Sequence, residues 1–170
     1  MVLNQILIDE MAEEQKEDVR KLLVSSYGQY EHEYKDAQVW EEYLANIKAS
    51  VDNQNVEKIL IAKSDDKILG TLQLFLSSEQ AYQRPELQIF SPIIRLLAIH
   101  PEARGRGIAQ ALLKAGLEFA KSQGANQLYL HTSDKMSKAI RLYEWLGFKR
   151  DQLKDFYNND VQVKCYRYDL

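Results

Sequence analysis

The stretch LAIHPEARGRGIAQ, residues 97–110, decides how this chain folds. The nearly continuous apolar run over residues 93–99 predicts a strand that is buried on both faces, and Pro101 ends it. The apolar spacing of residues 108–121 predicts a helix, with its start at about Gly105. The chain therefore passes from a buried strand into an amphipathic helix through one short loop.

The expected helix start offers a seat for an anion. The first turn of a helix has free backbone N–H groups and the positive end of the helix dipole. Gly105 and Gly107 carry no side chain that would block a phosphate, and Arg104 and Arg106 supply positive charge for a diphosphate. The bland alternative is a pair of solvated arginines at the start of a helix.

Two other phosphate motifs fit this stretch poorly. A P-loop needs Lys followed by Ser or Thr after its last glycine, whereas Ile108 and Ala109 stand here. A dinucleotide-binding fingerprint needs a third glycine and an acidic residue about 20 positions further on, where this chain has Asn126. The glycines therefore indicate a phosphate seat of a different kind.

The other elements are predicted from periodicity and from turn residues. Upstream we expect a strand over residues 2–8, helices over 14–27 and from Asp36 to about Val51, a hairpin of strands 57–62 and 68–76 around 65–67, and a loop over 77–88. Downstream we expect a strand over 127–132, a helix over 135–146 closed by Gly147, a strand from 148–150, a turn at 158–160 and a last strand over 161–168. This order predicts one α/β domain over residues 1–170, with a mixed, mostly antiparallel sheet of six to seven strands and about four flanking helices.

Composition and charge narrow the function. The chain has 170 residues, 45% of them apolar, and a formal net charge of −3. A nucleic-acid binder usually carries a basic excess, so no nucleic-acid partner is expected. No run approaches the roughly 18–20 apolar residues of a membrane span, and residues 1–11 lack the basic start of a signal peptide, so we expect no membrane contact and a cytoplasmic location. Cys165 is the single cysteine and has no neighbours at metal-ligand spacing, so no metal is expected.

Two motifs resemble those of the GNAT superfamily of N-acetyltransferases. Arg104, Gly107 and Ala109 match motif A in order, after a strand that ends in a Pro step at His100-Pro101. Residues 139–148, AIRLYEWLGF, look like motif B of the same family. The two motifs stand in the expected order and at the expected distance, and the layout of strands and helices agrees along the whole chain.

The resemblance implies a GNAT-like fold with splayed central strands and acetyl-CoA as co-substrate. It implies that the backbone of Leu97, Ala98 and Ile99 pairs with the pantetheine amides and the thioester carbonyl. It further implies that amides of the loop and the first turn hold the pyrophosphate, here Arg104, Gly105, Arg106, Gly107, Ile108, Ala109 and Gln110. Tyr143 of motif B would lie near the sulfur and assist the departing thiolate, although an aromatic residue on a helix's apolar face is more often part of the core.

The sequence departs from the family at two positions. Many members have Asn three residues before the motif B alanine, where this chain has Met136. Many members also carry a Glu near the middle of the motif A strand as general base, whereas residues 93–95 here read Ile-Ile-Arg. The base is therefore unassigned.

Four residues are candidates for the acceptor side. Tyr30, Glu31 and Tyr34 lie between the first two helices, in a region that borders the acceptor pocket in the family. Aromatic and carboxylate groups suit a cationic amine, while a solvated loop is the alternative. His131 ends a strand and could act as a base, although a lone His is more often structural.

We therefore predict an N-acetyltransferase that moves an acetyl group to a primary amine of a small molecule or peptide by direct attack, without a metal. A non-catalytic (acyl-)CoA-binding sensor or regulatory module is the alternative, favoured by Met136 and by the missing carboxylate. A homodimer is compatible with the resemblance, since the last strands could pair across an interface. The sequence does not identify the acceptor.

Overall fold

The structure, a computed structural model, describes residues 5–158 and 160–170. Its contacts divide the chain into two compact units. The first unit comprises Met1–Gln73 and Leu96–Ala115, and the second comprises Leu74–Arg95 and Gly116–Leu170. Two strands, β3 (Lys67–Phe75) and β4 (Ile93–Ile99), contribute residues to both units.

In the first unit the strand order is β1-β2-β3-β4. β1 (Leu7–Glu10) is antiparallel to β2 (Lys58–Ser64), with Leu7 opposite Lys63 and Glu10 opposite Leu60. Gln5 and Ile6, which the sequence placed in the first strand, precede β1, and the predicted strand residues 2–4 lie outside the described part. The predicted hairpin of β2 and β3 is confirmed, and its turn consists of Asp65, with a left-handed φ of 55°, and Asp66.

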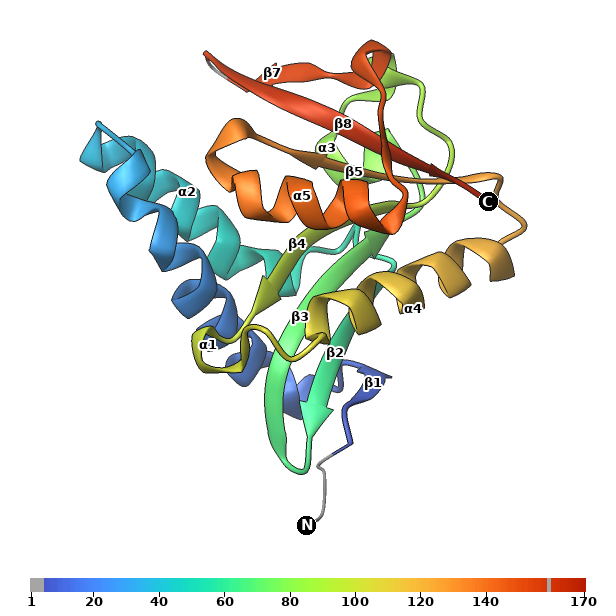
Figure 1. Cartoon of the computed structure of the whole chain (residues 1–170). Helices are drawn as coiled ribbons and strands as arrows, with labels where there is room; N and C mark the ends of the chain where they lie inside the picture. The colour runs from blue at the N-terminus through green and yellow to red at the C-terminus, as the bar shows by residue number, and fades with distance from the viewer. Residues whose placement is uncertain (1–4, 159) are drawn as a thin grey trace. The chain divides into compact units, whose positions relative to one another are not determined.

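Three helices belong wholly or partly to the first unit: α1 (Lys16–Tyr27), α2 (Ala37–Ala49) and the start of α4 (Ile108–Ser122) (Figure 1). A 3-10 segment, Gly28–Glu33, follows α1 directly. Asp36 caps α2 as the sequence predicted, because its carboxylate accepts a hydrogen bond of 2.9 Å from the backbone N–H of Gln38. The same α1 face that the sequence placed in the core is buried: Val19, Leu22, Leu23 and Ser26.

Gly70 on β3 lets α4 approach the sheet closely. A methyl group placed at Gly70 would lie 2.8 Å from Ile108 Cγ2, 3.0 Å from Leu112 Cδ1 and 3.1 Å from Ile99 Cδ1. Ile108 and Leu112 are 1% and 0% exposed, so they have little room to move. This contact fixes the first turns of α4 against β3 and against the end of β4.

In the second unit the order is β4-β5-β8-β6, and β7 pairs with β8. β4 runs parallel to β5 (Gln127–Thr132), and β8 (Val161–Asp169) is antiparallel to β5, β6 (Lys149–Arg150) and β7 (Phe156–Asn158). The mixed, mostly antiparallel sheet is thus confirmed, but it has eight strands among the described residues and not the predicted six to seven, since β6 and β7 are short strands of two and three residues. Asn159, in the predicted turn before β8, lies outside the described part.

The expected loop over residues 77–88 is partly wrong. It contains α3 (Ser78–Tyr82) and a 3-10 turn at Pro85–Leu87. The Ser77 hydroxyl accepts a hydrogen bond from the N–H of Gln80 and so starts the short helix. Further along, a 3-10 turn at Asp134–Met136 precedes α5 (Ser137–Leu146), which Gly147 ends with a φ of 108°.

Replacing Gly70 by Ala should lower the free energy of unfolding by about 1–3 kcal/mol, because the added methyl overpacks the α4 contact. Gly28→Ala is the matched control, since a methyl there meets nothing within 4 Å. Urea unfolding of the three proteins measures both effects. A Gly70→Ala protein as stable as Gly28→Ala would show that α4 does not depend on this close approach.

Candidate functional site

The loop between β4 and α4 is a turn with two left-handed glycines. Gly105 has a φ of 80° and Gly107 a φ of 77°. An α-helix needs a negative φ, so α4 begins at Ile108 and not at about Gly105 as the sequence suggested. A 3-10 turn at Pro101–Ala103 comes first, and the His100 Nδ1 accepts a 3.2 Å hydrogen bond from the N–H of Glu102.

This loop leaves open space beside both of its glycines. A Cβ atom placed at Gly105 or Gly107 would meet nothing within 4 Å. These glycines are therefore required for their backbone conformation, not because neighbouring atoms crowd them. Arg104 and Arg106 are both exposed. A left-handed turn followed by a helix start is a suitable arrangement of backbone donors for an anion, and the two guanidinium groups add charge.

β4 is interrupted at Leu96, whose φ is +54° inside the strand. A non-glycine residue in this region costs of order 1–3 kcal/mol and re-aims the backbone that follows. The flanking Arg95 and Leu97 are only half-buried, whereas Ile93 and Ile94 are buried. The sequence predicted the bounds of the strand, but it contained no signal for this distortion, because leucine is not a residue that prefers a positive φ.

The backbone after Leu96 presents its polar groups alternately to two edges. The His100 N–H donates to the Leu69 carbonyl of β3 at 2.8 Å. Alternate residues of a strand direct their N–H and C=O groups to the same edge, so Ala98 also faces β3, whereas Leu97 and Ile99 face the opposite edge. At that edge the Tyr27 hydroxyl donates to the Leu97 carbonyl at 3.3 Å. Of the three predicted strand residues, Leu97 and Ile99 are therefore the ones whose backbone can meet a ligand there.

An aromatic cluster surrounds Tyr27 in the first unit. Tyr34 stacks on Tyr43 with ring centroids 5.4 Å apart and lies 5.2 Å from Trp40, and Tyr27 lies 6.0 Å from Tyr30. Burial raises the pKa of Tyr30, and the nearby Arg104 guanidinium opposes that shift. The predicted acceptor-side residues Tyr30 and Tyr34 thus belong to one aromatic cluster, and Tyr30 lies near Arg104 of the loop. Glu31 is exposed.

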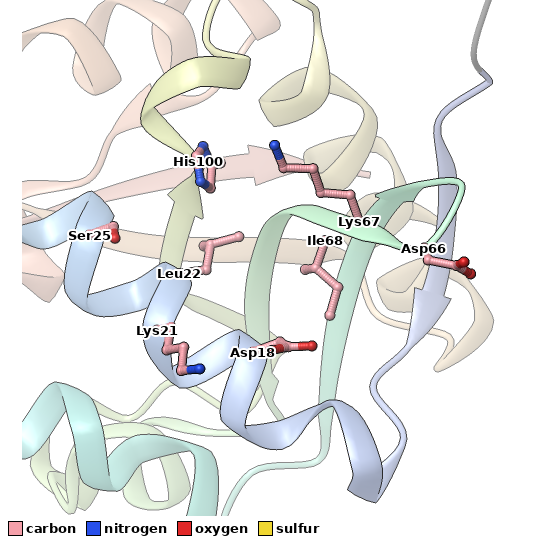
Figure 2. A pocket seen from close by; sticks show the side chains of 8 residues that line it. All are labelled: Asp18, Lys21, Leu22, Ser25, Asp66, Lys67, Ile68 and His100. Atoms are coloured by element: carbon pink, nitrogen blue, oxygen red, sulfur yellow. The ribbon is translucent and has the colours of Figure 1, made fainter.

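Two hollows of mixed charge lie beside the same loop. One, of about 280 Å³, is lined by α1, the β2–β3 turn and His100, with Leu22 and Ile68 among the lining side chains (Figure 2). The other, of about 560 Å³, lies among the β2–β3 turn, His100, Ala103 and Arg106. Lys67 lines both, and its amino group lies 3.9 Å from the Glu102 carboxylate. Each hollow is lined by both acidic and basic side chains.

In the second unit His131 lies in a small aromatic cluster. Its ring centroid is 4.8 Å from that of Tyr82 and 5.2 Å from that of Phe156. Its Nε2 lies 2.9 Å from the Lys154 carbonyl, and its Nδ1 is buried without a hydrogen-bond partner among the described residues. Burial lowers the pKa of His131 to about 4. Sequence reasoning named His131 but missed Tyr82 and Lys154, because Tyr82 stood in an expected loop and a backbone carbonyl leaves no pattern.

Tyr143 is a buried residue of α5. Its side chain is 7% exposed, and its ring centroid lies 6.1 Å from that of Phe148, which follows the helix. It belongs to the second unit, whereas the glycine loop belongs to the first. Residues 5–158 and 160–170 contain no cluster of three metal-ligating side chains and no helix that could span a membrane.

Comparison with known proteins identifies the family to which this chain belongs. The acetyltransferase (GNAT) family matches residues 16–148, which include both motifs. The chain belongs to the GNAT acetyltransferase family. The chain is 36% identical over 90 residues to human N-acetyltransferase 8B, covering 53% of this chain and 37% of the human protein. Rat N-acetyltransferase 8B is 32% identical over 107 residues, covering 63% and 46%, so the match spans less than half of these relatives.

Solved structures share the fold along nearly the whole chain. PaiA N-acetyltransferase from Thermoplasma acidophilum, crystallised with coenzyme A, has a TM-score of 0.68 at 19% identity and covers 96% of this chain and 99% of its own. The apo form of YjaB from Escherichia coli has a TM-score of 0.69 at 17% identity and covers 96% and 97%. At these identities the likeness establishes the fold.

His131 should make the stability of the protein depend on pH. Its pKa is about 4 when folded and about 6.5 when unfolded, so the unfolded chain binds the additional proton as the pH falls below 6.5. The expected loss between pH 7 and pH 5 is about 2 kcal/mol. Urea unfolding of the wild type and of His131→Gln at pH 7 and at pH 5 isolates the contribution of His131 to the free energy of unfolding. An equal pH dependence in the two proteins would contradict a buried neutral imidazole.

Proposed function

We propose that this chain is an acetyl-CoA-dependent N-acetyltransferase whose acceptor is a primary amine of a small molecule or peptide. The observation that carries the proposal is the loop of residues 100–107, which combines two left-handed glycines, two exposed arginines and the start of α4 directly after β4. Membership of the GNAT family supports acetyl-CoA as the donor. The coenzyme A complex of the PaiA enzyme supports the same donor for this fold.

The donor contacts follow from the backbone. The diphosphate would accept hydrogen bonds from the amides of residues 104–110, beside Arg104 and Arg106. The pantetheine arm would pair with Leu97 and Ile99, whose backbone groups face away from β3. An N–H of this strand end would polarise the thioester carbonyl and stabilise the charge that develops on its oxygen. No covalent enzyme intermediate is needed, because the amine attacks the thioester directly.

The two remaining roles belong to side chains. Tyr143 is proposed to stabilise the departing thiolate, since a phenol can donate a hydrogen bond to a sulfur anion when the geometry permits. Tyr30, Glu31 and Tyr34 are proposed to border the acceptor, in agreement with the position of Tyr30 beside Arg104. An aromatic wall with a nearby carboxylate suits an amine.

The direct test is thiol release from acetyl-CoA in the presence of a panel of amines, including polyamines, aminoglycosides, amino acids and peptide N-termini. Acceptor-dependent release, with the acetylated amine identified by mass spectrometry, supports the enzyme. Tight acetyl-CoA binding without release for any amine would instead support a non-catalytic CoA-binding module.

Replacing Gly107 by Val should weaken acetyl-CoA binding by about 10-fold or more, because the side chain projects into open space proposed for the diphosphate and disfavours the left-handed turn. Gly124→Val is the matched control, since Gly124 has a φ of 71° and equally open surroundings at the end of α4. Calorimetric titration measures both. Equal dissociation constants for the two variants would contradict the proposed binding of the diphosphate at this loop.

Tyr143→Phe should lower kcat by about 10-fold or more while leaving the dissociation constant of acetyl-CoA nearly unchanged, because only the hydroxyl is lost and the ring continues to pack on Phe148. Steady-state kinetics and calorimetry on the same preparation separate the two quantities. An unchanged kcat would exclude Tyr143 from the chemistry.

A further inference from the structure

The Tyr27 hydroxyl occupies a carbonyl at the end of β4 that a ligand would also need. Tyr27 is the last residue of α1, and its hydroxyl donates to the Leu97 carbonyl at 3.3 Å. Hydrogen bonds between a hydroxyl and an oxygen are usually about 2.7–2.8 Å long, so this bond is a weak one. Both residues belong to the first unit. The carbonyl is therefore held by a contact that a better donor can replace.

The edge of β4 at this carbonyl has the pattern of a strand that can take a partner. The Leu97 carbonyl and the Ile99 N–H face away from β3. The His100 N–H, which donates to the Leu69 carbonyl at 2.8 Å, fixes this alternation. A ligand that pairs with this edge in the manner of a parallel strand would donate an N–H to the Leu97 carbonyl and accept from the Ile99 N–H. The amides of a pantetheine arm supply such an N–H, so the arm and the phenol hydroxyl need the same carbonyl.

The Tyr27 ring is packed into the aromatic cluster of the first unit. Its centroid lies 6.0 Å from that of Tyr30 and 6.3 Å from that of Tyr43. Tyr43 stacks on Tyr34 at 5.4 Å and lies 6.0 Å from Trp40. Tyr27 and Trp40 are only 6% and 7% exposed. Closely packed rings have little free space around them, so a ring that turns at one end of the cluster displaces its neighbours.

The same cluster contains Tyr30 and Tyr34, two of the residues proposed to border the acceptor. Tyr30 packs against Tyr27, and it also lies near Arg104 of the glycine loop. A ligand can therefore act on the acceptor wall along two routes. One route starts at the Leu97 carbonyl and passes through Tyr27, whereas the other starts at Arg104 and depends on the diphosphate alone.

We propose that Tyr27 is a positioning residue that changes its partner when the donor binds. A pantetheine amide N–H replaces its hydroxyl on the Leu97 carbonyl, and the displaced ring moves Tyr30 and Tyr34. This inference rests on the proposed binding of acetyl-CoA along β4. Before the donor binds, the hydroxyl keeps the carbonyl paired and directed to the ligand edge, just after the left-handed Leu96. Binding of the donor then reshapes the acceptor wall, so the two substrates are coupled.

Loss of the hydroxyl should tighten donor binding. In Tyr27→Phe the pantetheine amide no longer replaces an existing hydrogen bond, while the ring stays in the cluster. The expected gain in affinity for coenzyme A is about 2- to 10-fold, the range that one ordinary hydrogen bond supplies. Tyr43→Phe is the matched control, because it removes a hydroxyl from the same cluster and leaves the bond to Leu97 in place. Calorimetric titration measures the affinities. An unchanged or weaker affinity in Tyr27→Phe, or an equal gain in Tyr43→Phe, overturns the exchange.

Trp40 reports whether the cluster moves. The chain has two tryptophans, and the other one, Trp145, is 71% exposed in the second unit. Trp145→Phe leaves Trp40 as the single tryptophan. Saturating coenzyme A should change the Trp40 emission in this variant and leave it unchanged once Tyr27→Phe is added. ADP, which carries the diphosphate without the pantetheine arm, should leave it unchanged in both. No change with bound coenzyme A, or an equal change with ADP or with Tyr27→Phe, contradicts the inference.

A carbon-13 measurement follows the carbonyl itself. With carbonyl carbon-13 in leucine and nitrogen-15 in alanine, only Leu-Ala peptides give a correlated signal, and the chain has two, Leu44-Ala45 and Leu97-Ala98. Tyr27→Phe removes the bond, so it should move the Leu97 resonance to lower frequency and thereby identify it. Coenzyme A should move the same resonance of the wild type to higher frequency, because a stronger bond replaces a weak one. A resonance that stays in place with coenzyme A bound argues against the exchange.

The inference and the proposed function fail in different ways. If coenzyme A does not bind to the wild type, the proposed function is wrong, and the inference falls with it. If the wild type binds coenzyme A and acetylates an amine, but Tyr27→Phe equals it in affinity and in the response of Trp40, only the exchange at Tyr27 is wrong.

Discussion

The close approach of α4 to β3 at Gly70 is the constraint on which the position of the loop of residues 100–107 depends. Ile108 and Leu112, which meet Gly70, are residues 1 and 5 of α4, so the contact fixes the beginning of the helix and not its middle. The chain leaves β4 at Ile99, which touches the same glycine, and returns at Ile108. The loop between them therefore has both ends fixed to one point of the sheet. Its two left-handed glycines are the residues that allow the chain to make this connection without a steric cost.

The sequence predicted the fold correctly wherever a residue pattern is compatible with a single local structure. Helical spacing, the Asp36 cap and the hairpin around residues 65–67 each correspond to one local structure, and each was confirmed. The apolar run over residues 93–99 predicted the bounds of β4, but the strand is not buried throughout, since residues 95–97 and Ile99 are only half-buried. The predictions failed where one residue pattern is compatible with two local structures. Gly105 suited a helix start as well as a turn, and only its φ of 80° distinguishes them. The segment 77–88 has too little periodicity to predict a five-residue helix that a single serine caps.

The candidate site was less predictable than the fold, because its properties depend on contacts between distant segments. The sequence identified Tyr30 and His131 as polar or aromatic residues in suitable places. It did not indicate that the Tyr27 hydroxyl meets the Leu97 carbonyl, 70 positions away, or that Leu96 has a left-handed backbone. The tautomer of His131 likewise depends on a carbonyl 23 positions further along the chain. Such features have no local signature, so only the folded chain reveals them.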